Sequence, residues 1–298
     1  MARIKEGSRM KGLRNVLVSV QSVLSVKSVI FLVFFGIGFT SCFQKQINIT
    51  LPPFKSQLVV EGYLEKGEPF QVAVSQTSNF FAAPDINAVF LRKATVILSY
   101  KNVVDTLVFN PVPNIKLLKW FNYQLKNKDT VPLTDGTVYN LKVIDSTGRV
   151  ATAQTTWFDS VKIDSVKEVI TKVNTVKYDT VMQVYFKDPA ATQDFYRFVA
   201  IDQSRDDSVR EDNFLSDDLF NGQTFSLSTG RHYQHGDTCD ITLYHIDQAY
   251  YTFLNTSNSA DNANGNPFAA PGAIISNISG GTGIFTALPA SHWKAVFK

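Results

Sequence analysis

The sequence predicts a mainly β protein built from two β-sandwich-like domains, the first of them immunoglobulin-like, with one short helix in the C-terminal half. Three observations predict this fold. Apolar and polar residues alternate along most of the chain, which is the period of a strand and not of a helix. Turn residues recur at short spacing between these runs. Of the 298 residues, 44% are hydrophobic and 18% charged, which is enough apolar material for a large core.

In the first half, short alternating runs are separated by turn residues. Lys101-Asn102, Asp135-Gly136 and Ser146-Thr147-Gly148 are typical of tight turns. We expect strands at residues 58–64, 70–75, 94–100, 103–109, 139–144 and 150–157. Strands at this spacing favour an immunoglobulin-like sandwich over residues 57–158.

The second half, residues 159–298, is expected to form another β-rich domain. Strands are predicted at residues 169–176, 181–186, 195–201, 224–228, 239–245, 283–285 and 293–297. The acidic stretch 206–218 reads as a solvated loop and does not match the spacing of an EF-hand calcium site. Asp247 is a natural N-cap for a short helix near 247–258, because Tyr250 and Phe253 follow at helical spacing.

The N-terminal 41 residues are expected to form an export signal. They are basic, and they end in an apolar run from Val29 to Phe39, which is too short to span a bilayer as a helix. Thr40-Ser41-Cys42 follows, and small residues before a cysteine at this place resemble a bacterial lipobox. We therefore expect a lipoprotein signal peptide at 1–41, an acylated Cys42 and a tether over 42–56. An unlipidated secreted protein and an uncleaved signal anchor remain the alternatives.

The basic balance of the chain comes from that signal. The whole chain has 29 basic and 26 acidic residues, whereas the part after residue 41 has 23 basic and 25 acidic residues. No basic patch is left to argue for nucleic acid. The chain has two cysteines, which excludes a disulfide scaffold. If Cys42 is acylated, Cys239 has no cysteine left to pair with.

Several segments, taken in order, resemble a known family. They are residues 58–63 with 70–75, 162–166, 188–190 before 195–198, 236–237, 250–254, 266–271 and 276–285. Together they resemble the Bacteroidota outer-membrane lipoprotein family called domain of unknown function 4249, over essentially the whole mature chain. The resemblance implies an outer-membrane lipoprotein with an accessory role beside TonB-dependent transporters, and it implies no catalytic residues. Residues 43–46 lack the acidic side chains of many surface-exported lipoproteins, so the membrane face stays open.

A search for catalytic motifs finds no G-x-S-x-G elbow and no phosphate-binding loop with its lysine. Gly280-Gly281-Thr282-Gly283 is better explained by positive φ or close backbone packing. His232, His235 and Asp237 are the strongest metal-like group, but strand geometry would separate the two histidines and a solvated turn is the preferred interpretation. We expect no cofactor and no bound metal.

Aromatic residues are abundant, with 23 Phe, 11 Tyr and 3 Trp, and most should lie in the core. Two aromatic segments fall in expected loops and are candidates for contact with a partner or a sugar. They comprise Phe80, Phe81, Trp120, Phe121 and Tyr123.

The favoured hypothesis is a non-enzymatic binding or accessory subunit at the outer membrane, probed by what co-purifies from native membranes. Its partners would be the membrane, through Cys42, and a TonB-dependent barrel, with a small-molecule or glycan ligand left unidentified. A structural or adhesive envelope protein is the alternative, and loss of the gene would then alter the envelope and not uptake. A metal-dependent hydrolase using His232, His235 and Asp237 is the third hypothesis and requires these side chains to converge.

Overall fold

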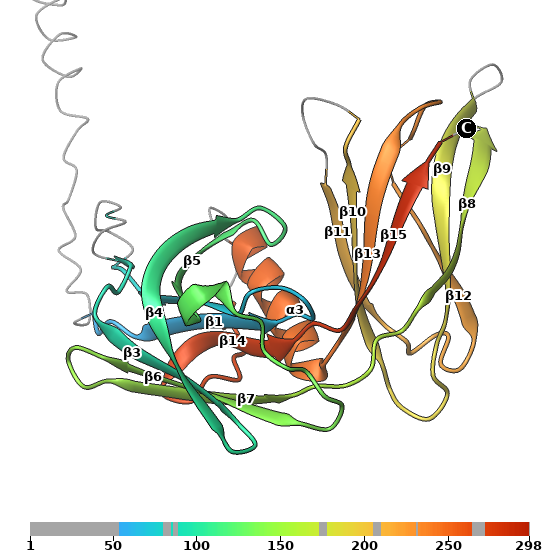
Figure 1. The fold of residues 1–298 in the computed structure, drawn as a ribbon. Coiled ribbons are helices and arrows are strands. Elements are labelled where there is room, and N and C mark those ends of the chain that lie inside the picture. The colour runs from blue at the N-terminus through green and yellow to red at the C-terminus, as the bar shows by residue number, and fades with distance from the viewer. Residues whose placement is uncertain are drawn as a thin grey trace, which may run out of the picture. The chain divides into compact units, whose positions relative to one another are not determined.

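The computed structural model describes residues 54–79, 85, 89–172, 178–204, 210–230, 232–263 and 272–297 (Figure 1). The predicted signal peptide, Cys42, Phe80 and Phe81 lie outside these residues. Phe54–Lys298 is one compact unit. As predicted, it is mainly β and carries a helix in its C-terminal half.

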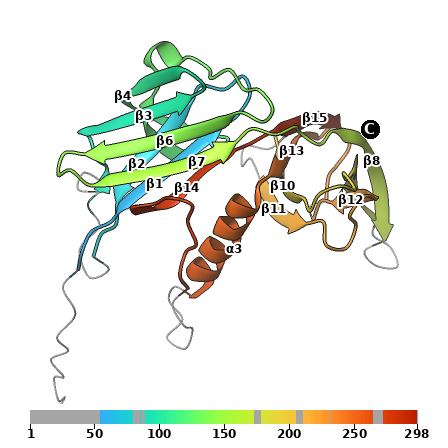
Figure 2. The same ribbon diagram turned by 90° about the horizontal axis from the view of Figure 1, so that it is seen from below.

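One sheet of eight strands gathers the N-terminal half of this unit and one strand from near the C-terminus. These strands are β1 (Leu58–Leu64), β2 (Gln71–Gln76), β3 (Ala94–Tyr100), β4 (Val103–Asn114), β5 (Lys119–Gln124), β6 (Val138–Asp145), β7 (Val150–Thr156) and β14 (Gly281–Ala287). Their order is β14-β1-β2-β5-β4-β3-β6-β7, and a 3₁₀ turn η1 (Lys126–Lys128) follows β5. The two edge strands meet, because Thr152 and Ser279 exchange backbone hydrogen bonds of 2.9 and 2.8 Å. The sheet thus curls around its own core (Figure 2).

The remaining strands form two sheets that pack face to face. They are β8 (Ile163–Lys172), β9 (Tyr178–Lys187), β10 (Phe195–Asp202), β11 (Arg210–Ser216), β12 (Thr224–Ser228), β13 (Thr238–Ile246) and β15 (Ala290–Val296). Their orders are β11-β10-β13-β15 and β12-β9-β8. Alternate residues of β9, β10 and β13 are buried between the sheets, as the period-two pattern requires.

Helix α3 (Gln248–Ala263) begins at the predicted N-cap and runs five residues beyond the predicted end at 258. The Asp247 carboxylate accepts the backbone N–H of Tyr250 at 2.7 Å, which confirms the cap. Tyr250 and Phe253 are buried in a cluster that also includes Tyr63 of β1, Phe195 of β10 and other residues of both halves. Within the described residues, no helix combines the length and the apolarity needed to cross a bilayer.

Strand β14 joins the two halves of the unit. It pairs in parallel with β1, from Leu58 opposite Gly281 to Leu64 opposite Ala287, and then leads through Leu288 and Pro289 into β15. The segment predicted as a second domain, 159–298, therefore contributes a strand to the first sheet. The division of the chain at 158/159 stays a prediction, but it does not coincide with a division between sheets.

Glycines allow this close pairing. Gly283 has φ of 120° and Gly280 has φ of 82°. A Cβ atom at Gly283 would overlap the carbonyl oxygen of Val60, and one at Gly280 would overlap that of Val150. Both explanations offered for this motif from sequence, positive φ and close packing, apply together.

Four segments differ from the sequence predictions. Strand β8 begins at Ile163, six residues before the predicted start at 169. Residues 210–216 form β11 and not part of a loop, because the acidic side chain of Asp212 is neutralised by arginines on β10 and β11. Trp120 and Phe121 lie in β5 and not in a loop. Strand β4 continues past 109 to Asn114, since a shift in register between Phe109 and Val112 accommodates the intervening proline, as bulges do.

An ion pair holds the β10–β11 hairpin against helix α3. Arg197 donates two hydrogen bonds, of 2.7 and 2.6 Å, to the Asp212 carboxylate and a third, of 2.5 Å, to the hydroxyl of Tyr250. Arg210 donates to the same carboxylate at 2.7 Å and to the backbone oxygen of Lys116 in the β4–β5 turn at 2.5 Å. One carboxylate thus fixes groups from both halves of the unit.

We predict that Gly283→Ala lowers the free energy of unfolding by at least about 3 kcal/mol, because strain at positive φ adds to a backbone overlap. Gly67→Ala is the matched control, since Gly67 has φ of 81° and open space around its Cβ position. Strain alone should cost it about 1 kcal/mol. Denaturant unfolding of both variants measures the difference, and equal losses would contradict the close-packing account.

A second prediction concerns acid. Burial alone would raise the pKa of Asp212, but hydrogen bonds and charge from Arg197, and then from Arg210, hold it below its ordinary value. Because the pKa is lowered in the folded state, the stabilisation is present above about pH 4 and is lost as pH falls through the folded value.

Asp212→Asn should therefore lower the free energy of unfolding at neutral pH by about 2–4 kcal/mol, because it leaves Arg197 buried without its partner charge. Its deficit relative to the wild type should shrink as pH falls below about 4. The exposed Asp135→Asn should show no deficit at either pH. A deficit that stays constant with pH in chemical denaturation would contradict the assignment.

Candidate functional site

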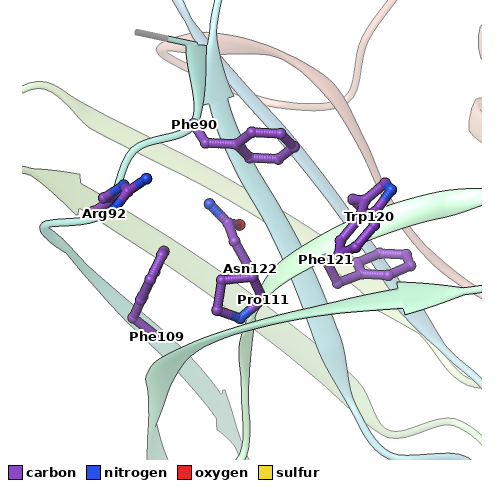
Figure 3. Close-up of a pocket in the computed structure, with 7 residues that line it drawn as sticks. All are labelled: Phe90, Arg92, Phe109, Pro111, Trp120, Phe121 and Asn122. Carbon is purple, nitrogen blue, oxygen red and sulfur yellow. The ribbon is translucent and has the colours of Figure 1, made fainter. Parts of the chain in front are cut away.

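An apolar pocket of about 480 Å³ opens beside strand β5, and it contains one of the aromatic segments singled out from sequence. Its volume lies in the range of ordinary ligand sites. The lining residues are Phe90, Arg92, Phe109, Pro111, Trp120, Phe121 and Asn122. In Figure 3, Arg92 and Phe109 lie to one side of Asn122, and Trp120 and Phe121 lie to the other.

The pocket forms where strand β5 separates from β2. Backbone pairing between them is limited to Gln71 with Gln124 and Val72 with Tyr123. Beyond this point the Asn122 side chain replaces the ladder, accepting the N–H of Val74 at 2.7 Å and donating to its carbonyl oxygen at 2.8 Å. The separation leaves room for aromatic side chains above the sheet.

The polar atoms of Asn122 are fully used by the fold, because its amide also donates to the carbonyl of Leu91 at 3.2 Å. Among the lining residues that the structure describes there is no carboxylate, imidazole, thiol or hydroxyl. These residues offer apolar and aromatic contact surface, with the guanidinium of Arg92 beside it, and supply no nucleophile or general base.

The predicted aromatic residues take different roles. Trp120 is 56% exposed and lines the pocket, whereas Phe121 is 1% exposed and packs into the cluster between the two halves of the unit. Tyr123 is buried, and its hydroxyl accepts the N–H of Ala94 at 2.8 Å and donates to the carbonyl of Leu91 at 3.1 Å. Tyr123 thus anchors the segment that carries the pocket residues Phe90 and Arg92.

Exposed apolar side chains continue from the pocket along the β4–β5 hairpin. Ile115 and Leu118, at the turn, are 81% and 68% exposed. Val108, opposite Gln124 where β4 pairs with β5, is also exposed. Large exposed apolar residues in one segment indicate a surface that contacts another molecule.

Besides Arg92, the lining residues Phe90, Phe109, Pro111 and Asn122 were not predicted as site residues from sequence. An asparagine in the middle of a strand, at position 122, is unusual and is the one local signal that a ladder is interrupted there. The other three come together only through the pairing of β4 with β5 and the isolated bridge between Ser75 and Phe90.

The metal-like residues His232, His235 and Asp237 lie at the turn before β13. Tyr233, which follows His232, is buried, and its ring stacks on Phe297 with the ring centroids 4.3 Å apart. His232 itself is exposed. His235 is also exposed, and Asp237 accepts the N–H of Gln234 at 2.8 Å. In the described part of the chain, these three side chains do not approach one another as metal ligands would.

We predict that Trp120→Ala changes the free energy of unfolding by less than about 1 kcal/mol, because the side chain is largely in solvent. Phe121→Ala should lower it by about 3–5 kcal/mol, because it opens a cavity in the core. Denaturant titration of the two variants separates the exposed residue from the buried one. A large loss for Trp120→Ala would show that its ring supports the fold.

The comparisons with known proteins place the chain in a family but not in a function. No curated protein matches it. Among solved structures it is similar to one titled "Cytokine receptor complex - Crystal form 1A", with 9% identity over 66% of this chain and 86% of that chain and a TM-score of 0.24. At that score the likeness carries no argument. The family model described as "Domain of unknown function (DUF4249)" matches residues 44–292, and the chain therefore belongs to that family.

Proposed function

We propose that this protein is a non-enzymatic lipoprotein, anchored to the outer membrane through Cys42, that binds a partner protein through its β4–β5 hairpin and the adjoining pocket. The partner we propose is a TonB-dependent outer-membrane barrel. The observation that carries the proposal is the exposed Trp120 beside a pocket whose described lining is apolar and aromatic.

The chemistry of the hairpin supports a protein partner. Tryptophan in a desolvated pocket is the residue type most often found to dominate the affinity of an interface. The neighbouring Ile115 and Leu118 extend the apolar surface beyond what a small ligand in the pocket would cover. Lys116 forms an ion pair with Glu65, and Lys119 forms one with Glu61. These pairs hold the hairpin in place without burying its apolar side chains.

Chain geometry supports a membrane-proximal position. Cys42 precedes Phe54, the first described residue, by twelve residues, and twelve residues span at most about 40 Å when fully extended. An acylated Cys42 would therefore keep the first sheet close to the bilayer. Acylation on more than one chain gives stable anchoring where a single chain would be marginal.

The proposal predicts that the tagged full-length protein, purified from native membranes in mild detergent, brings a TonB-dependent barrel with it in stoichiometric amount. Trp120→Ala should lower the recovered barrel at least about tenfold, which corresponds to roughly 1.4 kcal/mol of binding. Mass spectrometry identifies the co-purifying protein and the acylation of Cys42.

Ile170→Ala is the control, because Ile170 is a large apolar side chain, 71% exposed, on β8 and not on the hairpin or in the pocket. It should leave the recovery of the barrel unchanged. A protein that purifies alone, or a barrel retained equally by Trp120→Ala, would contradict the proposal.

A further inference from the structure

Three buried aspartates meet at one end of the second pair of sheets. Asp188 follows β9, Asp194 precedes β10 and Asp217 follows β11. Each offers a carboxylate oxygen within 4.8 Å of the others. Their side chains come from both facing sheets, and Asp188 and Asp217 are each only 1% exposed. Carboxylates at this separation and burial repel one another strongly unless a cation or a proton lies between them.

The carboxylate of Asp217 is incompletely satisfied by the protein. Its Oδ2 atom is buried and has no hydrogen-bond partner among the described residues. Backbone hydrogen bonds hold Asp217 on both sides. Its N–H donates to the backbone carbonyl oxygen of Asp194 at 3.0 Å, and its own carbonyl oxygen accepts the N–H of Phe220 at 2.8 Å. The side chain is therefore kept in the group, although an unpaired buried carboxylate oxygen is costly.

The other two carboxylates are oriented by surrounding donors. Asp188 accepts the hydroxyl of Tyr196 at 2.5 Å and the N–H of Gly222 at 2.7 Å. Asp194 accepts the hydroxyl of Thr192 at 2.8 Å and interacts with Nε2 of His245 at 2.8 Å. One donor on each oxygen leaves a lone pair free for a further ligand. Metal-binding carboxylates are commonly held by outer partners in this way.

The charge of the group matches a divalent ion. Three ionised aspartates carry three negative charges, and within the described residues the side chain of basic type paired with them is His245, whose Nε2 lies 2.8 Å from Asp194. Nδ1 of the same ring faces the carbonyl oxygen of Asp159 at 2.8 Å. One imidazole can offset at most one of the three charges, so at least two negative charges remain for a cation to balance.

We propose that Asp188, Asp194 and Asp217 bind a calcium ion that ties the ends of β9, β10 and β11 together. Calcium takes oxygen ligands at about 2.3–2.6 Å, so two ligand oxygens on opposite sides lie up to about 5 Å apart. Magnesium, at about 2.0–2.1 Å, requires separations below about 4.2 Å. These oxygens lie within 4.8 Å of one another, a separation that a calcium coordination sphere spans. Calcium also accepts irregular, carboxylate-rich sites, whereas magnesium demands a near-octahedral set of ligands.

The test uses the chelator-treated full-length protein in mild detergent. Terbium, which replaces calcium at oxygen sites, should show luminescence sensitised by Tyr196, because that hydroxyl is bonded to Asp188. We expect saturation at one ion per chain and displacement by calcium. Calorimetry should give a calcium dissociation constant on the order of 10⁻⁴ M or tighter, as in extracellular calcium modules. Calcium should also raise the midpoint of thermal unfolding.

Asp217→Asn should weaken calcium binding at least tenfold and abolish the calcium-dependent rise in the unfolding midpoint. Asp164→Asn makes the same change of charge at an exposed position on β8 and should behave as the wild type. Binding that is undiminished in Asp217→Asn would overturn the proposal. So would wild-type protein that binds no calcium at millimolar concentration, a result that stands even if Asp217→Asn does not fold.

Discussion

The parallel pairing of β14 with β1 is the constraint on which the rest of the structure depends. It brings residues 281–287 back to β1, the first strand that the structure describes, and closes the curled sheet against β7. It also determines where β15 starts, since only Leu288 and Pro289 separate the two strands. A single pairing thus connects the curled sheet to the sheet β11-β10-β13-β15. Gly280 and Gly283 make it possible, because any side chain there would overlap a backbone carbonyl.

The polar contacts at the junction follow from this arrangement. Once β14 and β15 are in place, helix α3 lies between Tyr63 on one side and β10 on the other, and Arg197 reaches both Asp212 and Tyr250. Arg197 contacts both oxygens of the Asp212 carboxylate, which is the strong form of an ion pair, and Arg210 pairs with the same carboxylate. Arg210 also donates to the β4–β5 turn, so the hairpin proposed to bind a partner is supported from the second half of the chain.

The two proposed sites depend on different physical effects. The pocket at Trp120 offers apolar contact area. The polar atoms of Asn122 in its lining are already hydrogen-bonded within the protein. The aspartate group offers uncompensated negative charge and an unpartnered oxygen. Neither requires a catalytic step. Both would let the protein hold another component, a macromolecule in one case and an ion in the other, while the fold supplies a fixed frame.

Local pattern in the sequence was enough for the mainly β class, most strands, the Asp247 cap and the need for glycine at 280–283. These features depend on neighbouring residues: side-chain period, turn chemistry and capping are short-range effects. Membership of the family called domain of unknown function 4249, confirmed over residues 44–292, was also visible there. What the tertiary structure alone decided was contact between distant segments. Asp217 falls in the acidic stretch that was predicted to be a solvated loop, and no local pattern links it to Asp188 and Asp194. Strand β5 is obscured by the lysines around it and by the prolines of the preceding segment. Burial and pairing across many residues determine both sites, and no local pattern records them.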